Sequence, residues 1–421
     1  MNVIISHPTG NQNVRAIISA LFKAGMLYKF NTTLSVNSQS KSIKLLPSAI
    51  RNEMLRRTFS LPSHKINTYP WLEISRFVLP KIGLKCGVKH ETGWASIDAV
   101  YKNLDRLTAK SLDQLVNEHK INAVYAYEDG ALETFKKAKQ LGLTCVYDLP
   151  IAFWEMSRRL LTEEAVRLPE WAQTLGGGIL DSTAKLDRKS EELELADVVV
   201  GPGQFVIDSL PVFTNYKKII ISPFGSPSTV FFANPGIELN KTNLINRPLR
   251  VLFVGSMGQR KGLGDLFAAM RLLNNPAIEL IVMGDLLAPM DFYKREFEHF
   301  IYEPGRSNSK VLALMRSCDV FCLPSIVEGR ALVMQEAMSQ GLPLIITANT
   351  GGEDLILEGK TGFLVPIRSP QEIANKINWF FENRSEIPIM GKLSQAHAAK
   401  YTWDKYGEKI TSELNKTACK I

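Results

Sequence analysis

The segment Pro324–Pro343, PSIVEGRALVMQEAMSQGLP, decides the fold of this chain. A short apolar run of strand type, Asp319–Leu323 (DVFCL), precedes it, and a second one, Leu342–Thr347 (LPLIIT), follows. Between them apolar residues recur at helical spacing, and Gly341 stands where such a helix would end. Strand, loop, helix and strand in this order are typical of one unit of a parallel sheet in an α/β protein.

Two acids mark the start of this helix. Glu328 stands before the first turn, and Glu336 lies about a turn and a half inside the helix, since each residue adds ~1.5 Å. Backbone N–H groups at a helix start form an anion site at the sheet edge where ligands bind. A nucleotide sugar fits this spacing, with sugar hydroxyls at Glu328, the diphosphate over the helix start and ribose hydroxyls at Glu336. A solvated helix with an N-terminal acid is the alternative. We expect these residues of the helix start to face the ligand: Gly329, Arg330, Ala331 and Leu332.

The spacing E-G-x-x-L-V-x-x-E-A from Glu328 resembles the E-x7-E signature of retaining glycosyltransferases of family 4, the group 1 transferases with a GT-B fold. The segments that follow, Asn349–Asp354 (NTGGED) and Thr361–Pro366 (TGFLVP), keep an order similar to that family. The resemblance covers Arg250–Pro366 and is weaker over residues 1–225. It implies an α/β fold of GT-B type, with two doubly wound Rossmann-like domains facing a central cleft.

A second motif opens the same half of the chain. The strand Arg250–Val254 leads into the loop GSMGQRKG, which begins at Gly255 and carries Arg260 and Lys261. An arginine can contact two phosphate oxygens and a lysine adds a point charge, so the loop is suited to clamp a diphosphate. Neither a P-loop nor G-x-G-x-x-G is present. The loop resembles the family's V-G-R-x-x-x-x-K-G motif, but Ser256 occupies the arginine position, and we expect Arg260 to replace that arginine. An ordinary surface loop is the alternative.

The first predicted strand, Val3–Ser6, ends in a turn that holds His7 and Gly10. In the family that the motifs resemble, this loop approaches the donor diphosphate and the acceptor. Gly10 would then let the backbone come close, and His7 would orient a phosphate or an acceptor hydroxyl. A turn histidine satisfied by the backbone explains His7 equally well.

Three acids, Glu128, Asp129 and Asp148, follow the predicted strands Ala123–Tyr127 and Thr144–Tyr147. The carboxyl ends of parallel strands face a cleft, so we expect these acids at its edge. Many members of the family carry a histidine in this area, next to the transferred sugar. This chain has none there, and Asp148 is the candidate replacement. A helix cap or turn acid is the alternative for Asp148.

The predicted helix Leu186–Ala196 carries Arg188 and Lys189. The resemblance implies that a basic residue of this helix can approach the donor phosphates. Ion pairing with Glu191 or Glu192 of the same helix is the interpretation that we favour.

The chain length of 421 residues predicts two or three domains. We expect an N-terminal acceptor-side domain over residues 1–225 and a linker over 226–247, where no periodicity is visible. A nucleotide-sugar-binding domain should follow over 248–398, and a final helix over 399–421 should cross back to the first domain.

Five scattered cysteines without a CxxC pair indicate reduced thiols in a cytoplasmic protein rather than a disulfide framework or a zinc site. The start MNVIISHPTG has no signal-peptide pattern, and the sequence contains no run of eighteen apolar residues. Because Asp-x-Asp is also missing, we expect no metal and no cofactor beyond the nucleotide-sugar substrate.

The net charge of +8 is concentrated in one stretch. Between Lys41 and His90, ten lysines and arginines stand against two glutamates, which accounts for the whole excess. Apolar and aromatic residues are interleaved, and this pattern suits the surface of an anionic membrane. We therefore expect a basic insertion at residues 40–90 that docks on the inner face of the cytoplasmic membrane; a solvated insertion is the alternative. No nucleic-acid-binding module accompanies the charge, so nucleic acid is not an expected partner.

The resemblance thus implies a retaining, metal-independent hexosyltransferase that acts in cell-surface polysaccharide or glycolipid synthesis. It would move a sugar from a UDP- or GDP-linked donor to a hydroxyl of a glycan or of a lipid-linked acceptor. The alternatives are a non-catalytic nucleotide-sugar-binding scaffold, which the missing histidine favours, and a sugar-nucleotide epimerase on the same fold. The candidate catalytic residues are Glu328, Arg260, Lys261 and Asp148. The candidate substrate-binding residues are Gly10, His7, Gly255, Gly329, Arg330, Ala331, Leu332 and Glu336.

Overall fold

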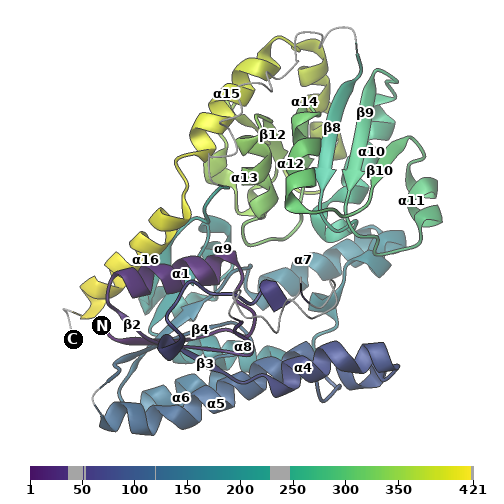
Figure 1. Ribbon diagram of the computed structural model, residues 1–421. Coiled ribbons are helices and arrows are strands. Elements are labelled where there is room, and N and C mark those ends of the chain that lie inside the picture. The colour runs from purple at the N-terminus through teal and green to yellow at the C-terminus, as the bar shows by residue number, and fades with distance from the viewer. Residues whose placement is uncertain (37–50, 52–53, 119, 228–246, 419–421) are drawn as a thin grey trace.

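Two parallel β-sheets form the framework of the chain in the computed structural model (Figure 1), which describes residues 1–36, 51, 54–118, 120–227 and 247–418. One sheet belongs to each half of the sequence, as predicted. Most of the predicted linker, residues 228–246, and the first part of the basic insertion, residues 40–50, lie outside the described residues.

Seven parallel strands build the N-terminal sheet. In spatial order they are β3 (Ile66–Thr68), β2 (Leu27–Thr32), β1 (Val3–Ser6), β4 (Ala123–Tyr127), β5 (Thr144–Asp148), β6 (Val198–Gly201) and β7 (Lys218–Ile221). The α-helices of this half are α1 (Gln12–Lys23), α4 (Trp71–Val78), α5 (Ile97–Asn117), α6 (Leu132–Gln140), α7 (Trp154–Arg167), α8 (Thr183–Leu195) and α9 (Gln204–Asp208). Short 3-10 turns are η1 (Ser63–Lys65), η2 (Leu79–Ile82), η3 (Lys85–Val88), η4 (Pro169–Thr174), η5 (Gly177–Ile179) and η6 (Val212–Tyr216).

Alternate residues of each central strand enter two different cores. In β1, Val3 and Ile5 belong to the core beside α1, whereas Ile4 belongs to the core beside α6. Both faces of the sheet are therefore covered, which is why these strands read as continuous apolar runs rather than alternating ones.

Six parallel strands build the C-terminal sheet. In spatial order they are β10 (Phe300–Glu303), β9 (Ile278–Met283), β8 (Leu249–Val254), β11 (Val320–Leu323), β12 (Leu344–Ile346) and β13 (Gly362–Leu364). The helices of this half are α10 (Leu263–Leu273), α11 (Met290–Glu296), α12 (Asn308–Arg316), α13 (Leu332–Ser339), α14 (Pro370–Glu382) and α15 (Glu386–Ala398). The strand order reverses between β8 and β11, which makes that pair the switch point of a doubly wound sheet.

The unit predicted from Pro324–Pro343 is confirmed. Helix α13 joins β11 to β12 and buries Met334 and Met338 in the C-terminal core. Gly341 follows the helix with a left-handed φ of 79°, the conformation that ends many helices and that favours glycine.

The last helix, α16 (Trp403–Ala418), returns to the N-terminal half (Figure 1). Its residues Tyr406, Ile410 and Leu414 join the core beside α1. Gly407 permits this contact, because an added Cβ would lie 2.4 Å from the Cβ of Ala20.

In the described part of the chain, no helix has the length and apolarity needed to cross a bilayer. The four cysteines in that part are free thiols, and three of them are buried.

The segment from α7 to η4 lies in the N-terminal half of the sequence, but its end packs into the core of the C-terminal half. Trp171 of η4 is buried in the C-terminal core, where its ring packs edge-on against Phe267 and Phe292. Its Nε1 donates to Glu296 at 3.1 Å. This segment, Trp154–Thr174, is called the strap below, because it ties the two halves together.

Replacing Trp171 by alanine should therefore destabilise the C-terminal half. Removing a buried aromatic side chain costs about 3–5 kcal/mol of unfolding free energy, which will appear as a lower thermal midpoint. Val166→Ala is the control, because Val166 lies on the same strap with 78% of its surface exposed. Equal midpoints for the two variants would contradict the assignment of the strap to this core.

Candidate functional site

Two loops meet at the switch point of the C-terminal sheet. The loop after β8 carries η9 (Gln259–Lys261), and the loop after β11 carries Glu328. Because β8 and β11 pair in parallel, their carboxyl ends bring the loops together. Lys261 Nζ lies 2.6 Å from Glu328 Oε1, and Arg260 Nη1 donates to the same oxygen. The acid and the two cations that the sequence singled out thus form one group, called the clamp cluster below.

The clamp cluster carries a net positive charge, since two cations share one carboxylate. Burial lowers the pKa of Lys261; the charge of Arg260 adds to this effect and the charge of Glu328 opposes it. Cations that are poorly solvated gain more from an anionic ligand than exposed ones do. The cluster is therefore suited to bind a diphosphate.

Glycines shape the backbone of this loop pair. A Cβ on Gly262, whose φ is 74°, would lie 2.0 Å from the carbonyl oxygen of Pro324, so only glycine fits there. The Ile326 N–H donates to the carbonyl oxygen of Arg260 at 2.9 Å and links the two loops. Gly255 lies beneath the Lys261 side chain, whose Cε is 3.6 Å from where a Cβ would be.

Gly329, the residue after Glu328, lies directly against the N-terminal half. A Cβ on Gly329 would lie 1.7 Å from the carbonyl oxygen of Pro150, at the end of the loop after β5. The Ala152 N–H donates to the carbonyl oxygen of Glu328 at 3.4 Å. Glu328 therefore stands at the boundary of the two halves.

The other residues of the helix start have partners within the protein. Arg330 is buried and pairs with Asp354 at 2.6 Å. The Ala331 N–H donates to the carbonyl oxygen of Thr350 at 3.2 Å, and Leu332 packs against the N-terminal core. The Arg330 guanidinium thus pairs with Asp354 rather than with the clamp cluster.

Glu336 lies farther along α13, on the side that faces α12. Its carboxylate accepts a hydrogen bond from Asn308 Nδ2 at 2.8 Å, and burial raises its pKa. Helix α13 begins at Leu332, so Glu328 stands before the helix and Glu336 lies in its second turn, as the sequence predicted.

His7 and Gly10 form a closed turn. His7 Nδ1 accepts the backbone N–H groups of Thr9 and Gly10, each at 3.0 Å. Burial, assisted by the charge of Arg57, lowers the pKa of His7 to about 3, so the ring is neutral. The ring of Phe59 covers Gly10, since an added Cβ would lie 2.3 Å from that ring. These contacts agree with the alternative for His7, a histidine satisfied by the backbone.

Asp148 points into the N-terminal core. Its Oδ2 accepts hydrogen bonds from the hydroxyls of Tyr125 (2.6 Å) and, across the molecule, of Tyr406 on α16 (3.4 Å). Only 1% of its surface is exposed. The structure does not bring Asp148 to the clamp cluster, because it faces a core closed by α16, which the sequence could not place.

A cavity of about 340 Å³ lies between the halves and reaches the clamp cluster at Arg260. The N-terminal half lines it with Glu128, Asp181, Lys189 and the ring of Trp154. Sequence analysis expected Glu128 at such an edge but missed Asp181 and Trp154, which carry no motif. Burial raises the pKa of Glu128, and Lys189, 3.5 Å away, opposes that shift. Charged groups beside an aromatic ring suit a polyhydroxylated ligand such as a sugar.

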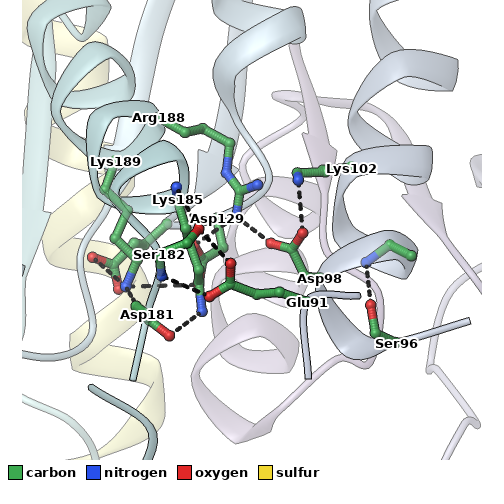
Figure 2. Close-up of polar contacts among 12 residues, drawn as sticks. Glu91, Ser96, Asp98, Lys102, Asp129, Asp181, Ser182, Lys185, Arg188 and Lys189 are labelled. Atoms are coloured by element: carbon green, nitrogen blue, oxygen red, sulfur yellow. Dashed lines mark hydrogen bonds and ion pairs between the residues drawn. The ribbon is translucent and has the colours of Figure 1, made fainter. Parts of the chain in front are cut away.

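Arg188 and Lys189 of α8 pair with acids from other elements (Figure 2). Arg188 Nη2 contacts Asp98 and, at 3.0 Å, Asp129. Lys189 Nζ lies 3.8 Å from Asp129 and 3.7 Å from Asp181. The favoured pairing with acids of the same helix is corrected by these contacts, which fix α8 to β4 and α5.

One group of potential metal ligands gathers in the described part of the chain. The ligand atoms of His90, Glu91 and Asp181 lie within 4.8 Å of one another. However, the ammonium group of Lys185 lies 3.0 Å and that of Lys189 3.7 Å from Asp181. These cations already balance the carboxylate charge, so we assign no metal to the group.

The strap positions the clamp cluster. Gln259, next to Arg260, is fully buried, and its amide donates to Glu164 of α7 and to Asp265, each at 2.8 Å. Its backbone N–H donates to Thr174 Oγ1 at 3.0 Å. Residues from the N-terminal half of the sequence therefore hold the loop that carries both cations.

Because the carboxyl group of Asp148 is buried, we expect the stability of the protein to depend on pH. Burial, opposed by the tyrosine hydrogen bonds, raises its pKa from 3.8 to about 7. A raised carboxyl pKa adds stability that is complete below about pH 4 and is lost as the pH rises through about 7. Asp148→Asn cannot ionise, so its thermal midpoint should fall less than that of the wild type between about pH 4 and pH 8. Asp187→Asn, at an exposed position, should follow the wild type; equal slopes for all three proteins would refute this role.

The C-terminal half matches a known family. Residues 237–399 match the family model described as glycosyl transferases group 1. The chain is 27% identical over 205 residues to D-inositol 3-phosphate glycosyltransferase of Paenarthrobacter aurescens, with 45% of this chain and 49% of the relative covered. It is 30% identical over 179 residues to a putative colanic acid biosynthesis glycosyltransferase of Salmonella typhimurium, with 39% and 42% covered. The match therefore spans less than half of each of these two curated relatives.

Solved structures share the fold over the whole chain. Sucrose-phosphate synthase from Thermosynechococcus elongatus has a TM-score of 0.61 at 15% identity, with 100% of both chains covered. HepE of Anabaena in complex with UDP has a TM-score of 0.61 at 16% identity, with 99% of this chain and 100% of that chain covered. The fold is thus α/β of GT-B type with two Rossmann-like domains, and over residues 237–399 the chain is similar to the glycosyl transferases group 1 family.

Proposed function

We propose that this protein is a retaining glycosyltransferase that moves a hexose-type sugar from a nucleotide-diphosphate sugar to a hydroxyl acceptor. The observation that carries the proposal is the clamp cluster, in which Lys261 and Arg260 share Glu328 beside the start of α13. Arg260 of the cluster lines a cavity to which both halves contribute.

In this mechanism the bond between the anomeric carbon and the diphosphate breaks, and negative charge builds on the leaving phosphate. Lys261, Arg260 and the N-terminus of α13 stabilise that charge, as preorganised cations and N–H dipoles do. They supply the charge that a divalent cation would otherwise supply, so we propose a metal-independent reaction. The acceptor hydroxyl attacks from the face that the diphosphate leaves, its proton passes to a phosphate oxygen, and the anomeric configuration is retained.

The donor and acceptor would occupy different walls of the cleft. Glu328 would hold sugar hydroxyls of the donor and Glu336 its ribose, while Glu128, Asp181 and Trp154 would receive the acceptor. Solved relatives of the same fold support a nucleotide-sugar donor: HepE was crystallised with UDP-glucose, and a trehalose-6-phosphate protein of Escherichia coli with UDP-2-fluoro glucose. Relatives named for colanic acid, amylovoran and capsular polysaccharide synthesis support a glycan or lipid-linked glycan as acceptor.

A non-catalytic nucleotide-sugar-binding scaffold is the second candidate. It is favoured by one observation: Asp148, at the place where the family resemblance implies a histidine, is buried away from the cavity. Both candidate functions require binding of the donor, but only the glycosyltransferase would transfer its sugar to an acceptor.

A panel of nucleoside diphosphates and their sugars should reveal the donor by thermal shift. A ligand at a hundred times its dissociation constant adds about 2.7 kcal/mol of stability. The stabilising nucleotide should lose most of this shift on Lys261→Ala, which removes one clamp charge, and keep it on Lys360→Ala, an exposed lysine of the same domain. If no member of the panel stabilises the folded wild type, the donor site is refuted.

Glu328→Gln separates catalysis from binding. The variant leaves both clamp cations without their carboxylate, so the diphosphate shift should be equal or larger. Transfer to alkyl glycoside acceptors should fall by about 10²–10³, the usual loss when one stabilising group of a transition state is removed.

The wild-type product should keep the anomeric configuration of the donor by NMR, and EDTA should leave the rate unchanged. A wild type that binds the donor without releasing diphosphate would establish the scaffold instead.

A further inference from the structure

Helix α4 and the turns after it expose a strip of large apolar side chains. Trp71, Ile74 and Val78 recur at helical spacing on one side of α4, and Trp71 is 80% exposed. Ile82, 62% exposed, and Leu84, 50% exposed, extend the strip through the following turns. We call these five residues the docking face. Several large exposed apolar side chains that follow one another along one segment indicate an interaction site, whereas single exposed apolar residues do not.

The opposite side of α4 is fixed to the protein. Glu73 is 1% exposed and pairs with Arg57 at 2.8 Å and with Arg76 at 2.9 Å. A buried carboxylate held by two guanidinium groups is costly to expose or to leave unpaired. The helix therefore cannot rotate its apolar side into the core, and the docking face stays directed outward, at the edge of the N-terminal domain where α4 lies along α5 (Figure 1).

The charge around the docking face is positive. Lys81, Lys85 and Lys89 are exposed and lie within or just after the strip. From Trp71 to Lys89 the one acid is Glu73, which is buried and paired. Lysines beside an apolar strip that ends in tryptophan complement anionic headgroups and the acyl region below them.

The docking face leads directly to the cavity of the cleft. The chain continues from Lys89 into His90 and Glu91; His90 Nε2 lies 3.1 Å from Asp181, and the Ser182 N–H donates to Glu91 at 3.0 Å. Figure 2 shows Glu91 and Asp181 within the same network. Asp181 lines the cavity, so the segment that follows the docking face contacts the wall of the proposed acceptor site.

We propose that the docking face binds an anionic lipid bilayer and thereby holds the cavity next to the membrane, from which a lipid-linked acceptor enters. The part that concerns the acceptor rests on the proposed function; the binding of lipid does not. The sequence suggested a membrane partner for residues 40–90 as a whole, from basic residues interleaved with apolar and aromatic ones. In the described part of that stretch, however, Arg57 and Arg76 form ion pairs with Glu73. We therefore assign the contact with the membrane to the docking face and to Lys81, Lys85 and Lys89.

Sedimentation with vesicles tests the proposal. The full chain should bind vesicles of phosphatidylcholine with about one third phosphatidylglycerol, bind phosphatidylcholine alone far more weakly, and lose affinity with added salt. Trp71→Glu with Ile82→Glu should weaken binding at least about tenfold, because charged groups do not enter the acyl boundary. The control is Val212→Glu on η6, where the side chain is 81% exposed in the same domain. Wild-type protein that stays in the supernatant, or three proteins that bind alike, would overturn the proposal.

Further measurements distinguish insertion into lipid from adsorption and from dimer formation, and distinguish the failure of this proposal from the failure of the donor site. Lipids with brominated acyl chains should quench part of the tryptophan emission, and Trp71→Phe should remove most of that quenching; adsorption by lysines alone would give none and would overturn insertion. A dimer that the paired glutamate substitutions dissociate, without vesicle binding, would assign the face to a second copy and overturn the proposal. All variants should retain the nucleotide thermal shift, whose absence in the wild type would refute the donor site without touching lipid binding.

Discussion

The site depends on one geometric constraint: β8 and β11 are neighbours although their order along the chain is interrupted by β9 and β10. Only this pairing places Lys261 within 2.6 Å of Glu328. Hydrogen bonding between the two loops and the close approach of Gly262 to Pro324 then fix the distance. The cations and the carboxylate neutralise one another in part, which lets three charged groups share a poorly solvated position.

The strap gives this constraint a second support. Helix α7 begins at Trp154, which lines the cavity, and ends near Glu164, which holds Gln259 beside the clamp cations. One helix therefore contacts the proposed acceptor region at one end and the donor clamp at the other. Trp171 of η4 is anchored in the C-terminal core, whereas Trp154 Nε1 at the other end of the strap donates to Ser190 of α8 at 3.0 Å. The strap is therefore attached to both halves.

The N-terminal half shows how burial decides the chemistry of a residue. His7 and Asp148 were candidates because each follows a strand, and both are enclosed. Burial keeps His7 neutral, and Asp148 faces Tyr125 and Tyr406 within the core, so neither side chain presents a charge to the cleft. The charges that do line the cavity, on Glu128, Asp181 and Lys189, come from three separate elements.

The sequence by itself determined the central strands β1, β4, β5, β8, β11 and β12, the unit around α13 and the presence of Arg260, Lys261 and Glu328 in loops at strand ends. These features are local, because side-chain periodicity, glycine stops and turn residues act over a few positions. Only the tertiary structure decided which strand ends lie next to each other. It also decided that Arg330 forms an ion pair with Asp354 and that α4 exposes its apolar side to solvent. The physical reason is that these outcomes depend on partners far away in the chain, such as α16 over Asp148 and the strap beneath Gln259, whose positions no local pattern encodes.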